Sequence, residues 1–292
     1  MRDIPSVLIV GTVRNCEKTF ESELNRLKRC FESVKIVGYY FVESDSVDST
    51  LEILEAAATK ISLFHFESLG IMSEEIPERV ERLRNCRNRY VSYIRENFST
   101  DNLDYVVVAD MDGINSSLTR FAVKACFRDL YWDAIFSNQV FGVSDLLALR
   151  ADNWLEGDFL HELEQSRIRL RKMKEPTSRL EKIQSFLLYD RTRKAIIYRR
   201  MRFLGFGKKL VPVHSAFGGI AIYRSWCFFH SDYTSANKPG ECEHVAFHRN
   251  LKKSNAELYI CPRFVNSVIN TYNVNKFFPV RLIRMLKWAN QE

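Results

Sequence analysis

The chain has 292 residues, 46% of them apolar, and a net charge of +7, which suits one large domain or one domain with an appendage. It contains no run of about 18–20 uninterrupted apolar residues, which excludes a membrane-spanning helix, and its first residues lack the apolar stretch of a signal peptide. The seven cysteines are scattered without a CxxC pair, which disfavours a disulfide framework or a zinc site. We therefore expect a cytoplasmic protein with free thiols.

The first half of the chain alternates between predicted strands and predicted helices. Continuous apolar runs predict strands, and apolar residues at helical spacing predict helices. The predicted strands are residues 7–13, 36–43, 62–66 and 105–111, and the predicted helices are residues 17–33, 49–59 and 74–98. This order predicts an α/β fold with a mostly parallel sheet flanked by crossover helices.

The second half is less regular and holds a basic block. Its predicted strands are residues 134–140, 219–224 and 257–265, and residues 164–210 are predicted to form a mostly helical insertion. Residues 164–209 contain 15 Lys or Arg and four acids, so the rest of the chain is slightly acidic. Such a block fits lipid headgroups, a polyanionic acceptor or nucleic acid, and a solvated helical surface explains it equally well. Residues 278–288 have an amphipathic pattern that favours packing on the core over a membrane surface.

Two carboxylates lie at the end of the fourth predicted strand, at the sheet edge where open parallel sheets collect ligands. Asp110-Met111-Asp112-Gly113 comes directly after the apolar run YVVV. Because alternate strand residues point to the same side, we expect Asp110 and Asp112 to approach one cation. Mg²⁺ or Mn²⁺ prefers such oxygen ligands, and a bound ion would neutralise a diphosphate leaving group. The sequence therefore predicts Asp110 and Asp112 as metal ligands, with Asp112 also taking part in catalysis.

Four motifs occur in an order that resembles the GT-A glycosyltransferases: GTVRNCE at 11–17, ESDSVDST at 43–50, RNCRNR at 84–89 and ADMDG at 109–113. The chain most resembles the cryptococcal capsule mannosyltransferase-like family and related bacterial surface-polysaccharide transferases. Residues 144–150 look like the family's D-x-x-A-x-R stretch, and residues 217–219 and 242–244 look like its acceptor loop and final acidic helix. The resemblance covers about residues 5–270, with residues 164–210 the least matched.

The resemblance implies one GT-A (Rossmann-like) domain over residues 1–292. A nucleotide-sugar half would cover about residues 1–130 and an acceptor half about residues 131–292, with the basic insertion at about residues 160–210. It also implies transfer of a sugar from a UDP- or GDP-sugar, with mannose as a candidate, to a glycan or lipid-linked acceptor in surface polysaccharide synthesis. It also favours an α-linkage made with retention of configuration.

The ends of the first two predicted strands are candidates for holding the nucleotide. Thr12, Arg14 and Asn15 sit where the first strand's loop would bind it, and an ordinary turn with a helix cap is the alternative. Glu43 ends the second strand and is predicted to accept hydrogen bonds from the base or ribose. Asp48 is better suited to capping the helix that follows.

The long helix over residues 74–98 presents a polar face. Arg84, Arg87 and Asn88 lie at i, i+3 and i+4, so their side chains can grip phosphate oxygens together. Salt bridges to Glu81 or neighbouring acids are the alternative. Arg82 lies elsewhere on the helix and is predicted to be solvated.

Glu243 and His244 open a predicted helix at the position where the GT-A family, which the chain resembles, supplies a catalytic carboxylate or a metal-reaching residue. Glu243 is predicted to act as general base on an acceptor hydroxyl or to stabilise an oxocarbenium-like transition state. A favourable interaction with the helix dipole is its alternative role. His244 is predicted as the third metal ligand, as a neutral imidazole, and His214 is a weaker candidate.

Two other functions explain parts of the sequence. A sugar nucleotidyltransferase would also use a metal-binding aspartate, but the lone Gly11 replaces the glycine-rich loop it needs. A basic membrane- or nucleic-acid-binding protein would explain residues 164–209 but leaves the strand-end acids without a role. We therefore predict a metal-dependent glycosyltransferase without a nucleic-acid partner, with residues 164–209 as a possible peripheral membrane contact.

Overall fold

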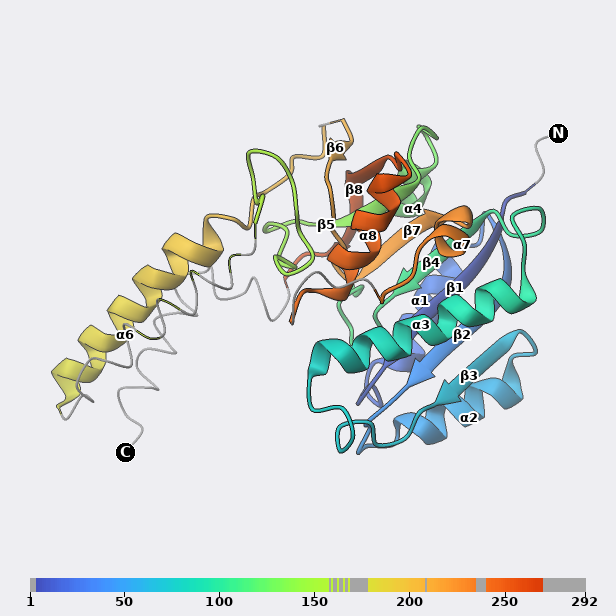
Figure 1. Ribbon diagram of the computed structural model, residues 1–292, viewed down its shortest axis with the longest axis horizontal. Helices are drawn as coiled ribbons and strands as arrows, with labels where there is room; N and C mark the ends of the chain where they lie inside the picture. Colours follow the sequence, from blue (N-terminus) through green and yellow to red (C-terminus); the bar gives the residue numbers. More distant parts are fainter. Residues whose placement is uncertain are drawn as a thin grey trace.

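The computed structural model describes residues 4–157, 178–207, 209–234 and 240–269, and the single residues 159, 162, 165 and 168. The tail helix predicted at 278–288 lies outside them. The described elements, in chain order, are β1 (Ser6–Val13), α1 (Phe20–Cys30), β2 (Lys35–Glu43), α2 (Thr50–Lys60), β3 (Phe64–Ser68), α3 (Arg79–Asn97), β4 (Tyr105–Ala109), α4 (Arg120–Cys126), β5 (Ala134–Gln139), α6 (Arg179–Arg193), the π-helix η1 (Lys194–Tyr198), β6 (Val211–Pro212), β7 (Ile220–Arg224), α7 (Trp226–His230), α8 (Glu243–Lys253) and β8 (Leu258–Ser267) (Figure 1).

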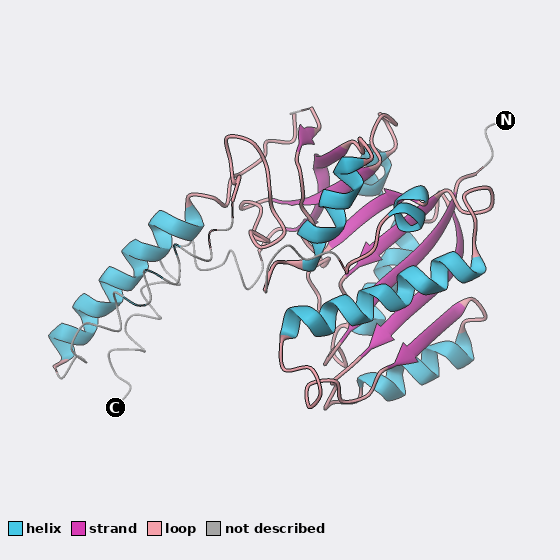
Figure 2. Ribbon diagram, viewed as in Figure 1, coloured by secondary structure: helices cyan, strands magenta, loops and turns pink. Residues whose placement is uncertain are grey.

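The strands form one sheet in the order β3-β2-β1-β4-β7-β5-β8-β6. β3, β2, β1 and β4 are parallel neighbours, as are β5 and β8. β7 runs antiparallel between β4 and β5, and the short β6 runs antiparallel along β8. The sheet is therefore mostly parallel and flanked by helices, as Figure 2 shows, which confirms the predicted α/β architecture.

Helices cover both faces of the sheet because strand residues alternate between two apolar cores. In β1, Leu8 and Val10 pack in the core that includes α3, α7 and α8, whereas Val7 and Ile9 pack in the core that includes α1, α2 and α4. A strand buried on both faces reads as a continuous apolar run, which explains why β1 was predictable. Burying each of these side chains stabilises the fold by about 1.5–3 kcal/mol.

Most of the predicted elements are confirmed, with shifted ends. α3 begins at Arg79 rather than at residue 74, because Pro77 disfavours helical geometry in the residue before it. β3 begins at Phe64 rather than at residue 62, since the backbone N–H of Phe64 first closes a turn onto the carbonyl of Ile61 at 2.9 Å. The short elements α4, β6 and α7 were not predicted, because five- or seven-residue helices and a two-residue strand show little periodicity.

Most of residues 160–177 of the basic insertion lie outside the described residues, and residues 179–198 are helical. α6 begins with a capping box in which Ser178 and Glu181 exchange side-chain-to-backbone hydrogen bonds of 3.2 Å. The helix continues into η1, and Figure 1 shows it projecting from the sheet as an arm. Across the described ranges, no helix combines the length and apolar character that a membrane crossing requires.

Candidate active site

Asp110 and Asp112 lie in the loop after β4 rather than on the strand itself, because β4 ends at Ala109. The prediction that strand alternation aligns their carboxylates is therefore wrong in its geometry. Asp110 is partly buried, and its Oδ1 lies 3.8 Å from Nη2 of Arg87. Asp112 is exposed, and its Oδ1 accepts a 3.2 Å hydrogen bond from the N–H of Ile114. Both carboxylates remain at the carboxyl edge of the sheet.

Negative charge accumulates around Asp110. Burial, against the opposing charge of Arg87, raises the pKa of Asp110 to about 7, and the nearby carboxylates of Asp112, Asp145 and Glu243 raise it further. Burial also raises the pKa of Asp145, to which Glu243 adds. Burial is the main cause of both shifts and the neighbouring carboxylates add to it, so a cation would be stabilised beside Asp110 and Asp145.

Asp145 is a site residue that the sequence analysis did not single out. Its two carboxylate oxygens accept hydrogen bonds from the N–H groups of Ala148 at 3.2 Å and Gly218 at 3.3 Å. These bonds hold the loop after β5 against the glycine loop before β7, beside Asp110. The D-x-x-A-x-R motif over residues 144–150 was the available signal, but the sequence alone assigned no role to its aspartate.

Arg87 and Glu243 join α3 to α8 beside Asp110. Nε of Arg87 donates to Oε1 of Glu243 at 3.1 Å, and the two side chains are only 4% and 6% exposed. The guanidinium also lies 5.3 Å from the ring centroid of Phe217 and 5.8 Å from that of Tyr233, which stabilises a buried cation. Glu243 is thereby held in one orientation at the N-terminus of α8.

The predicted phosphate-binding face of α3 does point into the protein, and its other two members have protein partners. Arg84 donates to Oε1 of Glu81 at 2.8 Å and to the carbonyl of Glu241 at 2.7 Å. Oδ1 of Asn88 accepts from the N–H of Tyr233 at 2.9 Å. The salt bridge weighed as the alternative is thus present for Arg84. A donor contact through this face stays a prediction.

Arg14 and Asn15 tie the end of β1 to the loop after β2. Nε of Arg14 donates to the carbonyl of Asp45 at 3.2 Å, and Oδ1 of Asn15 accepts from the N–H of Val47 at 2.9 Å. Asn15 adopts a positive φ of 51°, which asparagine tolerates better than most residues. Thr12 is partly buried within β1. Arg14 and Asn15 thus join the loops after β1 and β2 at the expected nucleotide position.

Glu43 is buried at the end of β2 and uses both oxygens within the protein. Oε1 accepts from the N–H of Ser46 at 2.9 Å, and Oε2 accepts from the hydroxyl of Ser68 at 2.5 Å. A nucleotide would have to share these acceptors, so the predicted base or ribose contact stays a prediction. Asp48 accepts from the N–H of Thr50 at 3.1 Å, but the N-cap of α2 is Ser49, whose side chain makes no capping hydrogen bond.

Arg82 and His214 lie outside this cluster. Arg82 is not solvated: it lies 3.3 Å from Oδ2 of Asp45 and donates to the carbonyl of Ile76 at 2.6 Å. These contacts turn the Arg82 side chain toward the loop that precedes α3, which begins at Arg79. His214 is half-exposed, with Nε2 2.8 Å from Oδ1 of Asp152.

His244 is buried at the first turn of α8 and stacks on Phe217 with ring centroids 4.0 Å apart. Burial and the charge of Arg87 lower its pKa well below the usual value, so the ring is neutral. Neither ring nitrogen has a hydrogen-bond partner among the described residues. In that part of the chain, no three His, Cys, Asp or Glu side chains are grouped closely enough to hold a metal. The predicted set of Asp110, Asp112 and His244 is therefore not assembled, since the imidazole packs on Phe217.

Asn115 is the second site residue that the sequence did not reveal. Its Nδ2 donates to the carbonyl of Asp110 at 2.7 Å, and its Oδ1 accepts from Nδ2 of Asn266 at 2.9 Å. The N–H of Asp110 in turn donates to the carbonyl of Gly219 at 2.8 Å. Gly219 has a φ of 101°, and a Cβ there would lie 2.5 Å from Ile114. Asn115 thus locks the loop of Asp110 to the glycine loop.

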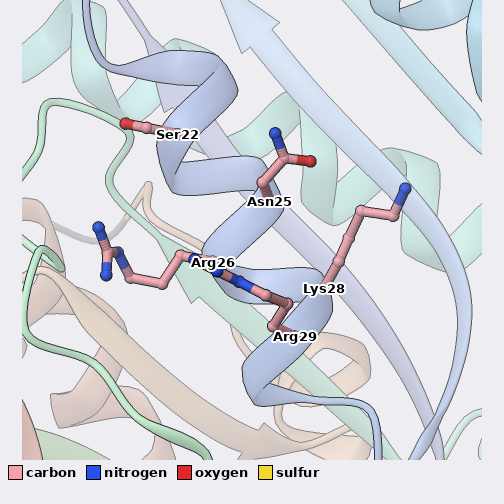
Figure 3. A pocket seen from close by; sticks show the side chains of 5 residues that line it. All are labelled: Ser22, Asn25, Arg26, Lys28 and Arg29. Atoms are coloured by element: carbon pink, nitrogen blue, oxygen red, sulfur yellow. The ribbon is translucent and has the colours of Figure 1, made fainter.

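A separate surface hollow lies on α1 and is lined by Ser22, Asn25, Arg26, Lys28 and Arg29. Figure 3 shows the side chains of Arg26 and Lys28 extending in opposite directions from the helix. Oε1 of Glu23, which is buried, lies 3.7 Å from Nε of Arg26. The hollow therefore does not gather its cations around one ligand position.

The fold and the carboxylates at the carboxyl edge of the sheet together define an α/β protein with an acidic site at its strand ends. No protein-family model and no curated protein matches the sequence. Among solved structures, the chain is similar to residues 1–349 of S. aureus TarS, with 13% identity and a TM-score of 0.46, over 98% of this chain and 67% of that one. Glucosyl-3-phosphoglycerate synthase from Mycobacterium tuberculosis, in complex with Mn²⁺, uridine diphosphate and phosphoglyceric acid, is similar at 13% identity and a TM-score of 0.43, over 99% and 80% of the two chains.

The mannosyltransferase PcManGT from Pyrobaculum calidifontis, in complex with GDP-Man and Mn²⁺, is similar at 11% identity and a TM-score of 0.44. The similarity covers 99% of this chain and 64% of that one. Similarities with TM-scores below 0.5 say what the chain resembles, and the function has to be inferred from the chain's own site.

Proposed function

We propose that the chain is a metal-dependent GT-A glycosyltransferase, which moves a sugar from a nucleoside diphosphate to an acceptor hydroxyl. The observation that carries this proposal is a set of four carboxylates at one sheet edge. Arg87 is buried between Asp110 and Glu243, and the other two are Asp112 after β4 and Asp145 after β5. One arginine does not balance four carboxylates, and carboxylates repel phosphate unless a cation lies between them. A divalent ion together with a diphosphate would balance the charge.

The residues present fit Mn²⁺ or Mg²⁺. Such ions are commonly bound by one or two carboxylates, with substrate phosphates and water completing the coordination. Asp110 and Asp112 offer carboxylates at the edge, and we assign them as the ligands. When bound, the ion would supply charge neutralisation of the diphosphate leaving group. The ring of His244 is neutral and its nitrogens have no hydrogen-bond partner within the described ranges, which supports it as a further ligand once the ring leaves its stack on Phe217.

The remaining residues are assigned by their position around this pair. Glu243 acts as base on the acceptor hydroxyl or stabilises positive charge on the sugar, and Arg87 holds its carboxylate in place. Thr12 and Glu43, near the ends of the adjoining strands β1 and β2, and Arg14 and Asn15, in the loop after β1, would bind the nucleoside. Arg84 and Asn88 support this side of the site, with phosphate contact as their further role.

The donor and acceptor are the finer part of the proposal. We infer a UDP- or GDP-sugar donor and a glycan or lipid-linked acceptor, with mannose favoured by the capsule-family resemblance of the motifs. We assign residues 1–130 to donor binding and residues 131–292 to acceptor binding within one domain.

Thermal unfolding with and without ligands tests the proposal directly. UDP and GDP would each be added with Mn²⁺, with Mg²⁺ and with a chelator. A ligand at about 100 times its Kd stabilises the fold by about 2.7 kcal/mol, which corresponds to a rise of several degrees in Tm for a protein of this size. We expect that rise for at least one nucleotide and only with the metal. An equal rise in Tm with the chelator would contradict the metal role. UTP and GTP would be added as comparisons, and a larger rise in Tm with either of them would favour a nucleotidyltransferase.

A further inference from the structure

Helix α6 carries apolar side chains along one exposed stripe. Leu180, Leu187 and Leu188 are 65%, 54% and 37% exposed. They lie at i, i+7 and i+8, and the exposed polar residues Gln184 and Arg191 lie on the same face at i+4 and i+11. Figure 1 shows α6 projecting from the sheet as an arm, and the exposed fractions of these leucines place them outside the core.

The same segment is strongly basic. Residues 178–207 contain eight Lys or Arg and two acids. Both acids are already used within the helix: Glu181 closes the capping box, and Asp190 pairs with Lys194 at 3.2 Å. Arg191 and Arg199 are exposed. Arg200 pairs with Glu162 at 2.9 Å, and an excess of positive charge remains in the arm beside its apolar side chains.

The base of the arm is joined to the acceptor side of the candidate active site. Nδ2 of Asn138, on β5, donates to the carbonyl of Leu204 at 3.2 Å. Phe203 and Phe206 flank this contact, are 56% and 46% exposed, and meet edge to face with centroids 6.1 Å apart. The loop that carries Asp145 follows the same strand, so the arm leaves the body beside the site.

We propose that α6 and η1 dock the protein on the surface of an anionic lipid bilayer. The leucines would enter the boundary between headgroups and acyl chains, while the arginines and lysines contact lipid phosphates. This occupant uses both properties of the arm. Nucleic acid would use the charge but leave the leucines in water, and a second copy of the arm would bring like charges together.

If the protein is the proposed glycosyltransferase, docking through α6 would also determine where its acceptor side lies relative to the membrane. Because the arm begins beside the loop of Asp145, a docked protein would hold its acceptor side close to the membrane. A lipid-linked acceptor, whose sugar stays at the headgroup level, could then reach the site without leaving the bilayer.

Co-sedimentation of the full chain with vesicles tests the docking. Vesicles of phosphatidylcholine alone and of phosphatidylcholine with phosphatidylglycerol would be compared at low and high salt, without nucleotide or metal. We expect binding to the phosphatidylglycerol vesicles that falls as salt rises, because salt screens exposed charges. Each cation near such a surface contributes roughly five-fold in binding, so Arg191→Gln with Arg199→Gln should weaken it by about 25-fold.

The apolar contribution needs its own variant and control. Leu187→Glu with Leu188→Glu should abolish vesicle binding and leave the thermal response to nucleotide and Mn²⁺ unchanged. Phe121→Glu places the same charge at a residue that is 78% exposed on α4, and should bind vesicles as wild type does. The inference is overturned if wild type does not sediment with phosphatidylglycerol vesicles at low salt, or if the leucine variant still does. A concentration-dependent dimer that this variant abolishes, without vesicle binding, would assign the stripe to a second copy instead.

Discussion

Replacing Asp112 by Asn separates its charge from its shape. Asp112 is exposed, and its Oδ1 accepts one hydrogen bond, from the N–H of Ile114 at 3.2 Å. The amide oxygen of Asn can accept the same bond, so the turn should be kept. An exposed substitution that keeps its hydrogen bond should change the free energy of unfolding by less than about 0.5 kcal/mol.

The same substitution should strongly weaken metal binding. Even residues that only support a metal ligand contribute about 10–100-fold to affinity, so loss of one of two assigned carboxylate ligands should reach at least about 100-fold. Removing this charge also removes one cause of the raised pKa of Asp110, which makes Asp110 a better ligand. That effect opposes the loss, so the measured change is a lower bound on the contribution of Asp112.

Calorimetric titration of Mn²⁺ in the presence of UDP or GDP measures this affinity, and urea unfolding measures the stability. Asp101→Asn is the matched control, because Asp101 is an exposed acid in a turn away from the sheet edge. It should bind Mn²⁺ as wild type does. If Asp112→Asn binds Mn²⁺ within two-fold of wild type while folding normally, Asp112 is not a ligand and the proposed site is wrong.

Two further substitutions test the surroundings of the site. Asn115→Ala should lower the free energy of unfolding by about 2–4 kcal/mol in urea, because the buried carbonyl of Asp110 and amide of Asn266 each lose a partner; a loss below about 0.5 kcal/mol would contradict this. Burial and the charge of Arg87 lower the pKa of His248 to about 3, so its neutral form is the folded one. As pH falls from about 6.5 toward 3, the unfolded chain gains a proton that the folded chain does not, which removes up to about 1.4 kcal/mol per pH unit. His248→Gln should therefore flatten the dependence of unfolding free energy on pH between 6 and 4 by one proton, and an unchanged slope would contradict the assignment.

The sheet was predictable where local pattern decides the structure. β1 and β4 are buried on both faces, and a continuous apolar run follows directly from that burial. The direction of β7 was not predictable in the same way. Ile220–Arg224 has the composition of any buried strand, and it runs antiparallel between β4 and β5 because of how the glycine loop returns the chain to the sheet. Strand direction is a property of the connection, which composition does not encode.

The site residues likewise fall into those that local sequence predicts and those that depend on distant contacts. The two aspartates at 110 and 112 were found because they are adjacent in sequence and follow a recognisable strand. Asn115 was not found because its role depends on Asn266, 151 residues further along the chain. The stack of His244 on Phe217 likewise joins the start of α8 to the glycine loop, and the spacing of residues in the sequence does not predict this contact.

Arg87 shows how one residue satisfies the sequence-based and the structural interpretation together. The sequence motif predicts Arg87 on a phosphate-binding face. In the structure its guanidinium lies between Glu243 and Asp110, with Nε 3.1 Å from Oε1 of Glu243 and Nη2 3.8 Å from Oδ1 of Asp110. Removing one partner of a buried ion pair is destabilising by about 3–5 kcal/mol, so this position needs a cation whether or not a donor binds. Without that cation, the carboxylates of α8 and of the β4 loop would face each other and repel. The acidic edge therefore accounts for the buried arginine. The same acidity, only partly compensated by one guanidinium, is what makes the edge a place for a divalent ion.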